Sequence, residues 1–276
     1  MNDILPTVLT IAGSDSGGGA GVQADLRTFN SFRIYGCSVI TAVTSQNPNE
    51  VRRVDVLPAE SVKSQLECVL DAFPIRFAKT GMLANQENIE CVAETVKKYD
   101  LSLIIDPVMV STSGARLLEE SAISAMQKKL FSLAKWITPN IPEAELLCNR
   151  KLSDPRQYAD AALQLFERYQ CNCLLKTGHA LTGDQAADII CYQGKLFSLS
   201  SPVLKLCGNT AHGTGCTLSA ALTANLALGR SWQDSLKSAK AFVYGSLTEN
   251  RFLSSTLAQM FPPEDNYFNL VSLKEL

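Results

Sequence analysis

The stretch His212-Gly213-Thr214-Gly215-Cys216 stands directly before a run of helix formers, residues 217–228, which Gly229 ends. Glycine residues let several backbone N–H groups turn toward one point, because no Cβ obstructs the turn. The first turn of a helix adds N–H groups without partners and a partial positive charge. Together these groups form a cradle for an anion such as a phosphate. The stretch therefore predicts a site for a charged oxygen group and for phosphoryl chemistry.

The thiol of Cys216 begins this helix, where the positive end of the helix dipole is expected to lower its pKa. Residues 208–213 share the outer glycine spacing of a Walker A loop, but Thr214 stands where that loop requires a lysine. The stretch is therefore predicted to be an anion cradle of a different kind from a P-loop. His212 is predicted to hold the loop rather than to bind a metal.

Strand-like apolar runs alternate with helical patterns along most of the chain. Strands are predicted at residues 7–11, 37–44, 75–79, 101–105, 134–137 and 173–176, and a hairpin at 187–192 and 195–199. Helices are predicted at residues 24–32, 61–72, 86–98, 119–131, 142–147, 158–169, 217–228 and 232–248. This alternation predicts an α/β fold of three layers (αβα), with a central, mostly parallel sheet and helices on both faces. We expect a single domain over residues 1–276, with a polar, irregular tail after Phe261.

Polar residues follow the ends of the predicted central strands. Because the carboxyl ends of parallel strands share one edge of a sheet, these residues are expected to converge there. Asp106 ends one strand and Glu143 follows another, and their carboxylates are suited to Mg²⁺ and its waters. Lys176, at a further strand end, is placed to meet phosphate oxygens. Asp25, on the first helix, can accept a hydrogen bond from a substrate hydroxyl or amine.

Composition narrows the class of protein. The formal net charge is -2 and no block of like charges occurs, so no nucleic-acid partner is expected. No apolar run approaches the roughly 20 residues of a membrane span, so no membrane partner is expected either. Nine cysteines, an odd count, fit free thiols in a reducing cytoplasm. With only two histidines, a structural zinc site is not expected.

Six stretches occur in order between about residues 7 and 250. They are Ala12-Gly13-Ser14-Asp15-Ser16-Gly17-Gly18-Gly19-Ala20-Gly21-Val22-Gln23-Ala24-Asp25, Thr41-Ala42-Val43-Thr44-Ser45-Gln46-Asn47, Asp106-Pro107-Val108-Met109-Val110, Thr138-Pro139-Asn140-x-x-Glu143, Lys176-Thr177-Gly178-His179 and His212-Gly213-Thr214-Gly215-Cys216-Thr217. Together they resemble the ribokinase-like superfamily, and within it the hydroxymethylpyrimidine and phosphomethylpyrimidine kinases of thiamine biosynthesis. The glycine- and histidine-rich ending common in that family is absent after about residue 250.

The resemblance implies ATP-dependent phosphorylation of 4-amino-5-hydroxymethyl-2-methylpyrimidine, and then of its monophosphate to the diphosphate. It implies that Asp25 and Gln46 hold the pyrimidine, in a pocket lined by Gly13, Ala20, Met82 and Val108. It implies that ATP and Mg²⁺ are bound by Lys176, Thr210, Asn140, Glu143 and Asp106. The amides of residues 213–216 would stabilise charge on the transferred group. Relatives are commonly dimers, so the resemblance also implies a homodimer, expected in the cytoplasm.

Two alternative functions and two roles for Cys216 stay open at this point. A kinase of pyridoxine, pyridoxal or pyridoxamine would act on a ring of similar size that also carries a hydroxymethyl group. A catalytically inactive ligand-binding sensor is the other alternative, although Asp106, Glu143, Lys176 and Cys216 argue against it. The Cys216 thiolate would accept the hydroxymethyl proton, or positioning and electrostatics alone would suffice for phosphoryl transfer.

Overall fold

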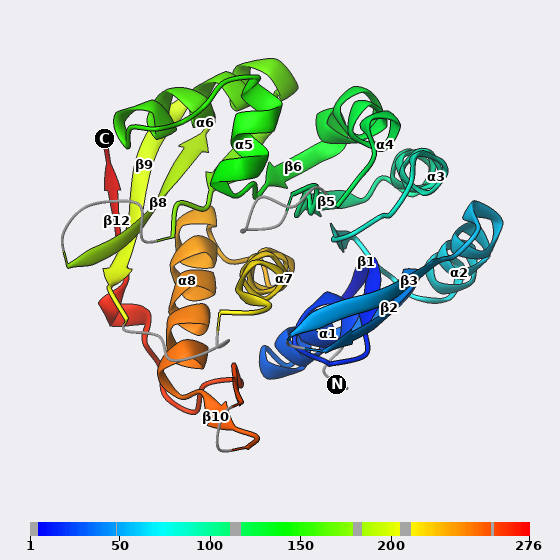
Figure 1. The fold of residues 1–276 in the computed structure, drawn as a ribbon, viewed down its shortest axis with the longest axis horizontal. Helices are drawn as coiled ribbons and strands as arrows, with labels where there is room; N and C mark the ends of the chain where they lie inside the picture. The colour runs from blue at the N-terminus through cyan, green and yellow to red at the C-terminus, as the bar shows by residue number, and fades with distance from the viewer. Residues whose placement is uncertain (1–4, 48, 111–116, 179–183, 205–210, 255–256) are drawn as a thin grey trace.

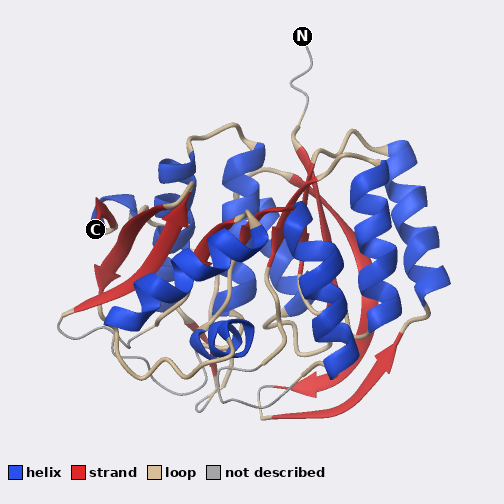
Figure 2. Ribbon diagram, turned by 90° about the horizontal axis from the view of Figure 1, so that it is seen from above, coloured by secondary structure: helices blue, strands red, loops and turns tan. Residues whose placement is uncertain are grey.

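A 10-stranded sheet runs through the molecule in the order β12-β9-β8-β7-β6-β5-β4-β1-β2-β3, with helices on both faces (Figures 1 and 2). The computed structural model describes residues 5–47, 49–110, 117–178, 184–204, 211–254 and 257–276. The strands of this sheet are β1 (Thr7–Asp15), β2 (Tyr35–Asn47), β3 (Glu50–Val56), β4 (Phe77–Thr80), β5 (Ser102–Ile105), β6 (Ala134–Ile137), β7 (Asn172–Leu175), β8 (Gln185–Tyr192), β9 (Lys195–Pro202) and β12 (Ser272–Glu275). A separate pair is formed by β10 (Arg251–Phe252) and β11 (Ala258–Gln259).

The central strands, in the order β2-β1-β4-β5-β6-β7, pair in parallel. Antiparallel strands extend both edges: β3 beside β2, and β8, β9 and β12 beside β7. The helices are α1 (Gly21–Ser31), α2 (Ala59–Ala72), α3 (Gln86–Lys98), α4 (Glu120–Ala125), α5 (Ile141–Cys148), α6 (Arg156–Tyr169), α7 (Thr214–Ala227) and α8 (Trp232–Thr248). The predicted three-layer α/β fold with a mostly parallel central sheet is confirmed.

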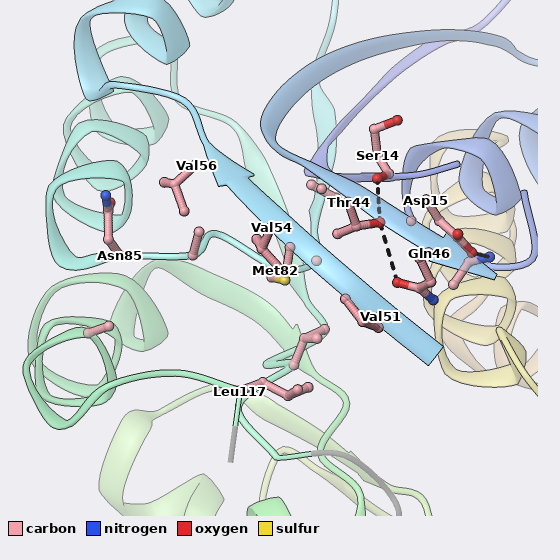
Figure 3. A pocket seen from close by; sticks show the side chains of 18 of the residues that line it. Ser14, Asp15, Thr44, Gln46, Val51, Val54, Val56, Met82, Asn85 and Leu117 are labelled. Carbon is pink, nitrogen blue, oxygen red and sulfur yellow. Dashed lines mark hydrogen bonds between the residues drawn. The ribbon is translucent and has the colours of Figure 1, made fainter. Parts of the chain in front are cut away.

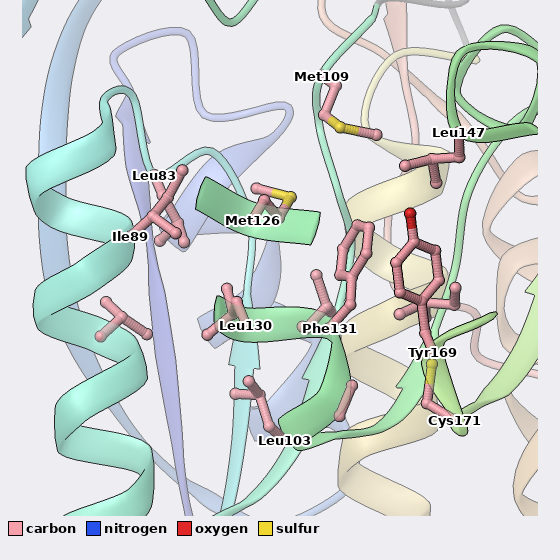
Figure 4. Close-up of a cluster of buried hydrophobic side chains, with 14 of the residues drawn as sticks. Leu83, Ile89, Leu103, Met109, Met126, Leu130, Phe131, Leu147, Tyr169 and Cys171 are labelled. Atoms are coloured by element: carbon pink, nitrogen blue, oxygen red, sulfur yellow. The ribbon is translucent and has the colours of Figure 1, made fainter. Parts of the chain in front are cut away.

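The two faces of the sheet bury different sets of side chains. On β5, Leu103 and Ile105 join the apolar cluster that α2 to α6 cover, whereas Ile104 between them joins the cluster under α7 and α8. This alternation follows from the strand period of two residues. Figure 4 shows part of the first cluster, where Phe131 and Tyr169 meet edge to face with ring centroids 4.8 Å apart. Apolar residues on both faces thus fix the sheet between its two helical layers.

Helix α7 lies deep inside the second layer, and its residues from Thr217 to Asn225 are all buried. Many of these side chains are small, which lets the helix approach its neighbours closely. Ala220 and Ala224 pack with Phe29 of α1, and Leu222 packs in the cluster beside α8. Because α7 is held on several sides, its first turn has a defined position above the carboxyl ends of β1 and β4.

Three parts of the fold differ from prediction. Strand β3 was not predicted, because every residue in it is exposed and its sequence lacks a buried stripe. The predicted helix 119–131 is α4 followed by a π turn, Met126–Leu130, and a 3-10 turn, Phe131–Leu133; the changed winding leaves Met126, Leu130 and Phe131 fully buried. The tail was predicted to be irregular, but β12 pairs antiparallel with β9.

None of the helices in the described residues combines the length and the apolar character that crossing a bilayer requires.

Candidate active site

A cavity of about 690 Å³ opens at the carboxyl ends of β1, β2 and β4, where the sequence motifs were expected to converge. Figure 3 shows its walls: Val51, Val54 and Val56 of β3 on one side, and Ser14 and Asp15 at the end of β1. The predicted site residues that line it are Gly13, Ala20, Gln46, Met82, Val108 and Cys216. The cavity is largely apolar, and polar side chains line it at two places: at the ends of β1 and β2 and at the starts of α3 and α4.

Gln46 is the polar side chain that sequence reasoning placed in the pocket, and it lies in the cavity wall (Figure 3). Its Oε1 accepts a hydrogen bond from Thr44 Oγ1 at 3.3 Å, and its Nε2 lies 3.3 Å from His212 Nε2. An amide offers both a donor and an acceptor, as an aminopyrimidine edge requires.

Val108 has a φ of 46°, a left-handed conformation that strains a β-branched residue at the cavity edge.

The anion cradle is the first turn of α7. Thr214, Gly215 and Cys216 are already helical, three residues earlier than predicted, and Gly213 is the N-cap with a φ of 84°. Thr217 N–H is bonded to the Gly213 carbonyl at 2.9 Å, so the N–H groups of Gly215 and Cys216 come too early for an intrahelical acceptor. These two amides are the donors that the glycine motif predicted.

Contacts with the N-terminal loop hold the cradle in place. A Cβ on Gly213 would lie 1.9 Å from the Gly19 carbonyl oxygen, so the two backbones touch. His212 Nε2 lies 3.2 Å from Asp15 Oδ2, and Asp15 also accepts the N–H groups of Gly17 and Ala20. His212 thus has the loop-holding role predicted for it, whereas Asp15 was not singled out from the sequence.

Below the cradle lie two pairs of opposite charge, one fully buried and one partly exposed. Lys79 Nζ lies 2.8 Å from Asp25 Oδ2, and Lys176 Nζ lies 2.7 Å from Asp106 Oδ1. A Cβ on Gly215 would lie 3.3 Å from Lys176 Nζ and 3.6 Å from Asp106 Oδ2. The second pair is therefore directly against the helix start. Lys79 was missed, although a lysine inside the apolar run of β4 is the signal that could have revealed it.

Asp25, which is predicted to hold the pyrimidine, lies outside the cavity lining in this structure. Its side chain has no exposed surface and does not line the cavity. Its carboxylate accepts hydrogen bonds from Lys79 Nζ and, at 2.6 Å, from Thr10 Oγ1. Helix α1 turns Asp25 inward onto β1 and β4, so the carboxylate lies beneath the cavity rather than in it.

Asn140 and Glu143 begin α5 as a reciprocal capping box. Asn140 Oδ1 accepts the Glu143 N–H at 2.9 Å, and Glu143 Oε2 accepts the Asn140 N–H at 2.8 Å. Glu143 Oε1 also accepts the Met109 N–H at 3.0 Å. Burial raises the pKa of Glu143 to about 7, against the opposing charge of Lys176. Each carboxylate oxygen therefore already has a backbone partner.

A magnesium ion fits Asp106 better than Glu143. Among the described residues, Asp106 Oδ2 accepts one long hydrogen bond, from Ser219 Oγ at 3.4 Å, and this oxygen faces the cradle. Mg²⁺ in proteins takes one or two carboxylates together with waters and substrate phosphates. No cluster of three or more His, Cys, Asp or Glu residues that could hold a metal occurs within the described ranges. Thr210, predicted to contact ATP, lies outside the described residues.

The expectation of a lowered pKa for Cys216 is wrong. Burial raises the pKa of its thiol to about 11, while the charge of Lys79 and the Gly21 N–H act in the opposite direction. Loss of hydration thus outweighs the helix N-terminus. In the ligand-free protein the thiol carries its proton at neutral pH.

The layered sheet, the helix-borne anion cradle and the cavity beside it are those of a ribokinase-like α/β protein. A family model described as phosphomethylpyrimidine kinase matches residues 15–258. The chain therefore belongs to the phosphomethylpyrimidine kinase family. It is 44% identical over 247 residues to a hydroxymethylpyrimidine/phosphomethylpyrimidine kinase of Haemophilus influenzae, covering 87% of this chain and 90% of that protein.

Two solved structures extend the comparison. Phosphomethylpyrimidine kinase from Clostridium difficile is 38% identical, with a TM-score of 0.76, over 86% of this chain and 97% of that one. Pyridoxal kinase from Staphylococcus aureus in complex with ADP is 33% identical, with a TM-score of 0.86, over 99% of this chain and 100% of that one. The second similarity includes the C-terminal tail.

Replacing Gly213 with alanine should destabilise the protein and remove the cradle. A left-handed alanine costs about 1–2 kcal/mol, and the Cβ would also collide with the Gly19 carbonyl. Gly229→Ala is the matched control, because Gly229 has a φ of 73° but nothing within 4 Å of the added Cβ. In urea unfolding, Gly213→Ala should lose more free energy than Gly229→Ala; equal losses would show that the backbone contact does not matter.

Glu143 should make the protein less stable as the pH rises from about 4.5 to 7. The unfolded chain releases this proton near the ordinary pKa of 4.5, whereas the folded protein keeps it to about 7. The folded state therefore binds more protons in this window, and its free energy of unfolding falls as pH rises. Glu143→Gln should remove this contribution to the decline, as measured by urea unfolding at a series of pH values.

Glu145→Gln on the same helix is the control for this experiment. The pKa of Glu145 is lowered, chiefly by the Leu152 N–H and Lys151 acting against burial, so it titrates below the window. This variant should keep the wild-type slope between pH 4.5 and 7. A wild-type slope in Glu143→Gln would contradict the assignment.

Proposed function

We propose that the protein is an ATP-dependent kinase that phosphorylates 4-amino-5-hydroxymethyl-2-methylpyrimidine and then its monophosphate, giving the diphosphate for thiamine biosynthesis. The observation that carries this proposal is the first turn of α7, whose free amides stand between a cavity of about 690 Å³ and the Lys176–Asp106 pair. The family membership and the identity to curated kinases support the same substrate.

In this proposal the pyrimidine ring lies against Val54, Met82 and Val108, and Gln46 pairs with its polar edge. The hydroxymethyl oxygen attacks the γ-phosphorus of ATP, the bond from that phosphorus to the β,γ-bridging oxygen breaks, and ADP leaves. The hydroxyl proton passes to an oxygen of the transferred phosphoryl group and from there to water. The amides of Gly215 and Cys216 stabilise charge on the transferred group.

The remaining groups act on charge. Lys176 turns from Asp106 toward the phosphates of ATP. Asn140 and Thr210 complete the proposed ATP site. Mg²⁺, when bound, would neutralise phosphate charge; Asp106 would hold it directly, and Glu143 would accept hydrogen bonds from its waters. Since the ligand-free thiol is protonated, the reaction relies first on positioning and electrostatics, with the Cys216 thiolate as proton acceptor only after ionisation.

Phosphorylation of vitamin B6 is a second candidate function. The pyridoxal kinase structure aligns with 99% of this chain, tail included, at a higher TM-score than the phosphomethylpyrimidine kinase structure. The apolar cavity would accept either ring. This observation supports pyridoxal as a second substrate, while sequence identity favours the pyrimidine.

A substrate panel tests the proposal. Purified protein with ATP and Mg²⁺ would be given the pyrimidine, its monophosphate, pyridoxal, pyridoxine and pyridoxamine, with each product identified by mass. Both pyrimidine phosphates should form, and Lys176→Met should form neither, which controls for contaminating kinases. Turnover of pyridoxal with little pyrimidine phosphate would favour the second candidate. Binding of the pyrimidine without use of ATP would instead indicate an inactive sensor.

We also propose one catalytic domain over residues 1–276 that acts as a cytoplasmic homodimer. Eight cysteines within the described ranges are free thiols, which supports a reducing compartment. Strand β3 is an open edge of the sheet, whose unpaired backbone groups a second copy would cover. Light scattering should give twice the chain mass; a monomer at micromolar concentration would contradict the dimer.

A further inference from the structure

The amide of Gln46 lies between two hydrogen-bonding neighbours in the cavity wall (Figure 3). One end of the amide is 3.3 Å from Thr44 Oγ1, and the other end is 3.3 Å from His212 Nε2. The oxygen and the nitrogen of an amide have nearly the same shape, so the neighbours decide which of the two atoms faces which side. They therefore also decide what Gln46 offers to a ligand.

The contact with Asp15 makes His212 Nε2 a donor. This nitrogen lies 3.2 Å from Asp15 Oδ2, an oxygen that also accepts the Ala20 N–H at 2.9 Å. A carboxylate has no hydrogen to give, so the contact requires a hydrogen on His212 Nε2. A ring nitrogen that carries a hydrogen cannot accept one as well. The Gln46 atom that faces His212 is then the acceptor, Oε1.

Thr44 leads to the same orientation of the amide. Its Oγ1 donates to the Ser14 carbonyl at 3.0 Å, and a hydroxyl has only one hydrogen. Thr44 can therefore accept from Gln46 but cannot donate to it, so the Gln46 atom on this side is Nε2. In the opposite orientation two donors would meet at His212, and two acceptors would meet at Thr44.

The orientation sets the order of donor and acceptor along the cavity wall. His212 stands next to Gly213, the N-cap of α7, whereas Thr44 lies in β2 opposite Asp15 of β1. Oε1 of Gln46 is therefore on the side of the cradle, and Nε2 is on the side of the sheet. A ring that pairs with both atoms must present a donor toward the cradle and an acceptor toward the sheet.

The pyrimidine named above meets this order in one pose. Its 4-amino group is a donor, the ring nitrogen N3 beside it is an acceptor, and the hydroxymethyl arm on C5 is on the other side of the amino group. With the amino group on Gln46 Oε1 and N3 on Nε2, the arm extends toward the first turn of α7. With the amide reversed, the arm would extend away from the cradle.

We propose that His212, held by Asp15, is a positioning residue that fixes the Gln46 amide with its oxygen toward the cradle, and so selects rings with a donor beside the hydroxymethyl arm. The identity of the ligand rests on the proposed kinase function, but the orientation of the amide does not. Pyridoxal carries an aldehyde oxygen beside its hydroxymethyl group. That acceptor would meet Gln46 Oε1, so the same network disfavours pyridoxal.

A pair of ligands with opposite hydrogen-bond order tests the selection without ATP. In 5-hydroxymethyl-2-methylpyrimidin-4-one, an oxygen replaces the amino group and N3 carries a hydrogen. Isothermal titration calorimetry would compare its dissociation constant with that of the aminopyrimidine. The wild-type protein should bind the aminopyrimidine about tenfold more tightly, because the analogue places an acceptor against Oε1 and a donor against Nε2.

Two substitutions of His212 test the role of its Nε2 atom. The side chain in His212→Gln can place an amide nitrogen near that position, so this variant should retain most of the preference. The shorter side chain in His212→Asn cannot, and the preference should fall about fivefold. Both variants lose the ring, so general damage to the loop would weaken both ligands alike. An unchanged preference in His212→Asn would overturn the proposal.

Neutron diffraction from crystals of the ligand-free protein in D₂O tests the orientation directly. Deuterium should be found on His212 Nε2 and on the Gln46 atom that faces Thr44. Deuterium on the Gln46 atom that faces His212 would overturn the proposal. If the pyrimidine is neither bound nor phosphorylated, the proposed function fails, yet the neutron result still decides the orientation of the amide.

Discussion

The contact between the backbones of Gly213 and Gly19 is the constraint on which the site depends. A side chain on either residue would collide with the other segment, since a Cβ on Gly19 would lie 2.6 Å from His212 Cδ2. The contact joins the loop after β1 to the start of α7, far apart in sequence. Asp15 then fixes both segments through His212 and the loop amides. The amides of the cradle therefore point at one place relative to the cavity.

The charges below the cradle divide into two kinds. Lys176 is partly exposed, so in the proposed reaction it can exchange its partner Asp106 for an arriving phosphate. Lys79 is wholly enclosed, and its partner cannot change. The net charge of the anion site is close to zero without a ligand, because Asp106 balances Lys176 and Asp25 balances Lys79. Much of the attraction for a phosphoryl group then comes from oriented amides, which need no reorganisation.

Most of the layered fold could be predicted from sequence, because buried strands and amphipathic helices carry clear periods. Strand β3 could not, since an exposed edge strand buries no stripe of side chains. That Gln46 and Met82 lie at one edge of the sheet followed from the rule that parallel strands end there. Their place in the pocket came from the family resemblance, and Cys216 came from the glycine motif before α7.

The errors at the site have a common cause. The predictions for Asp25 and Cys216 used helix position and the family resemblance, but the direction and burial of a side chain depend on what packs against the helix. Asp25 turns toward Lys79, which donates to its carboxylate. Burial raises the pKa of the Cys216 thiol by more than the helix dipole lowers it. A sequence pattern gives neither the direction of a side chain nor its burial.

The β2–β3 hairpin has a thermodynamic consequence for ligand binding. Val51, Val54 and Val56 form a cavity wall, yet each is 43% exposed or more. These valines keep apolar surface exposed to water after folding. An aromatic ligand bound against them would bury that surface. Association should then carry a negative heat-capacity change, and the hairpin should exchange its amide hydrogens more slowly once occupied. A bound ligand would therefore complete the apolar packing on this side of the cavity.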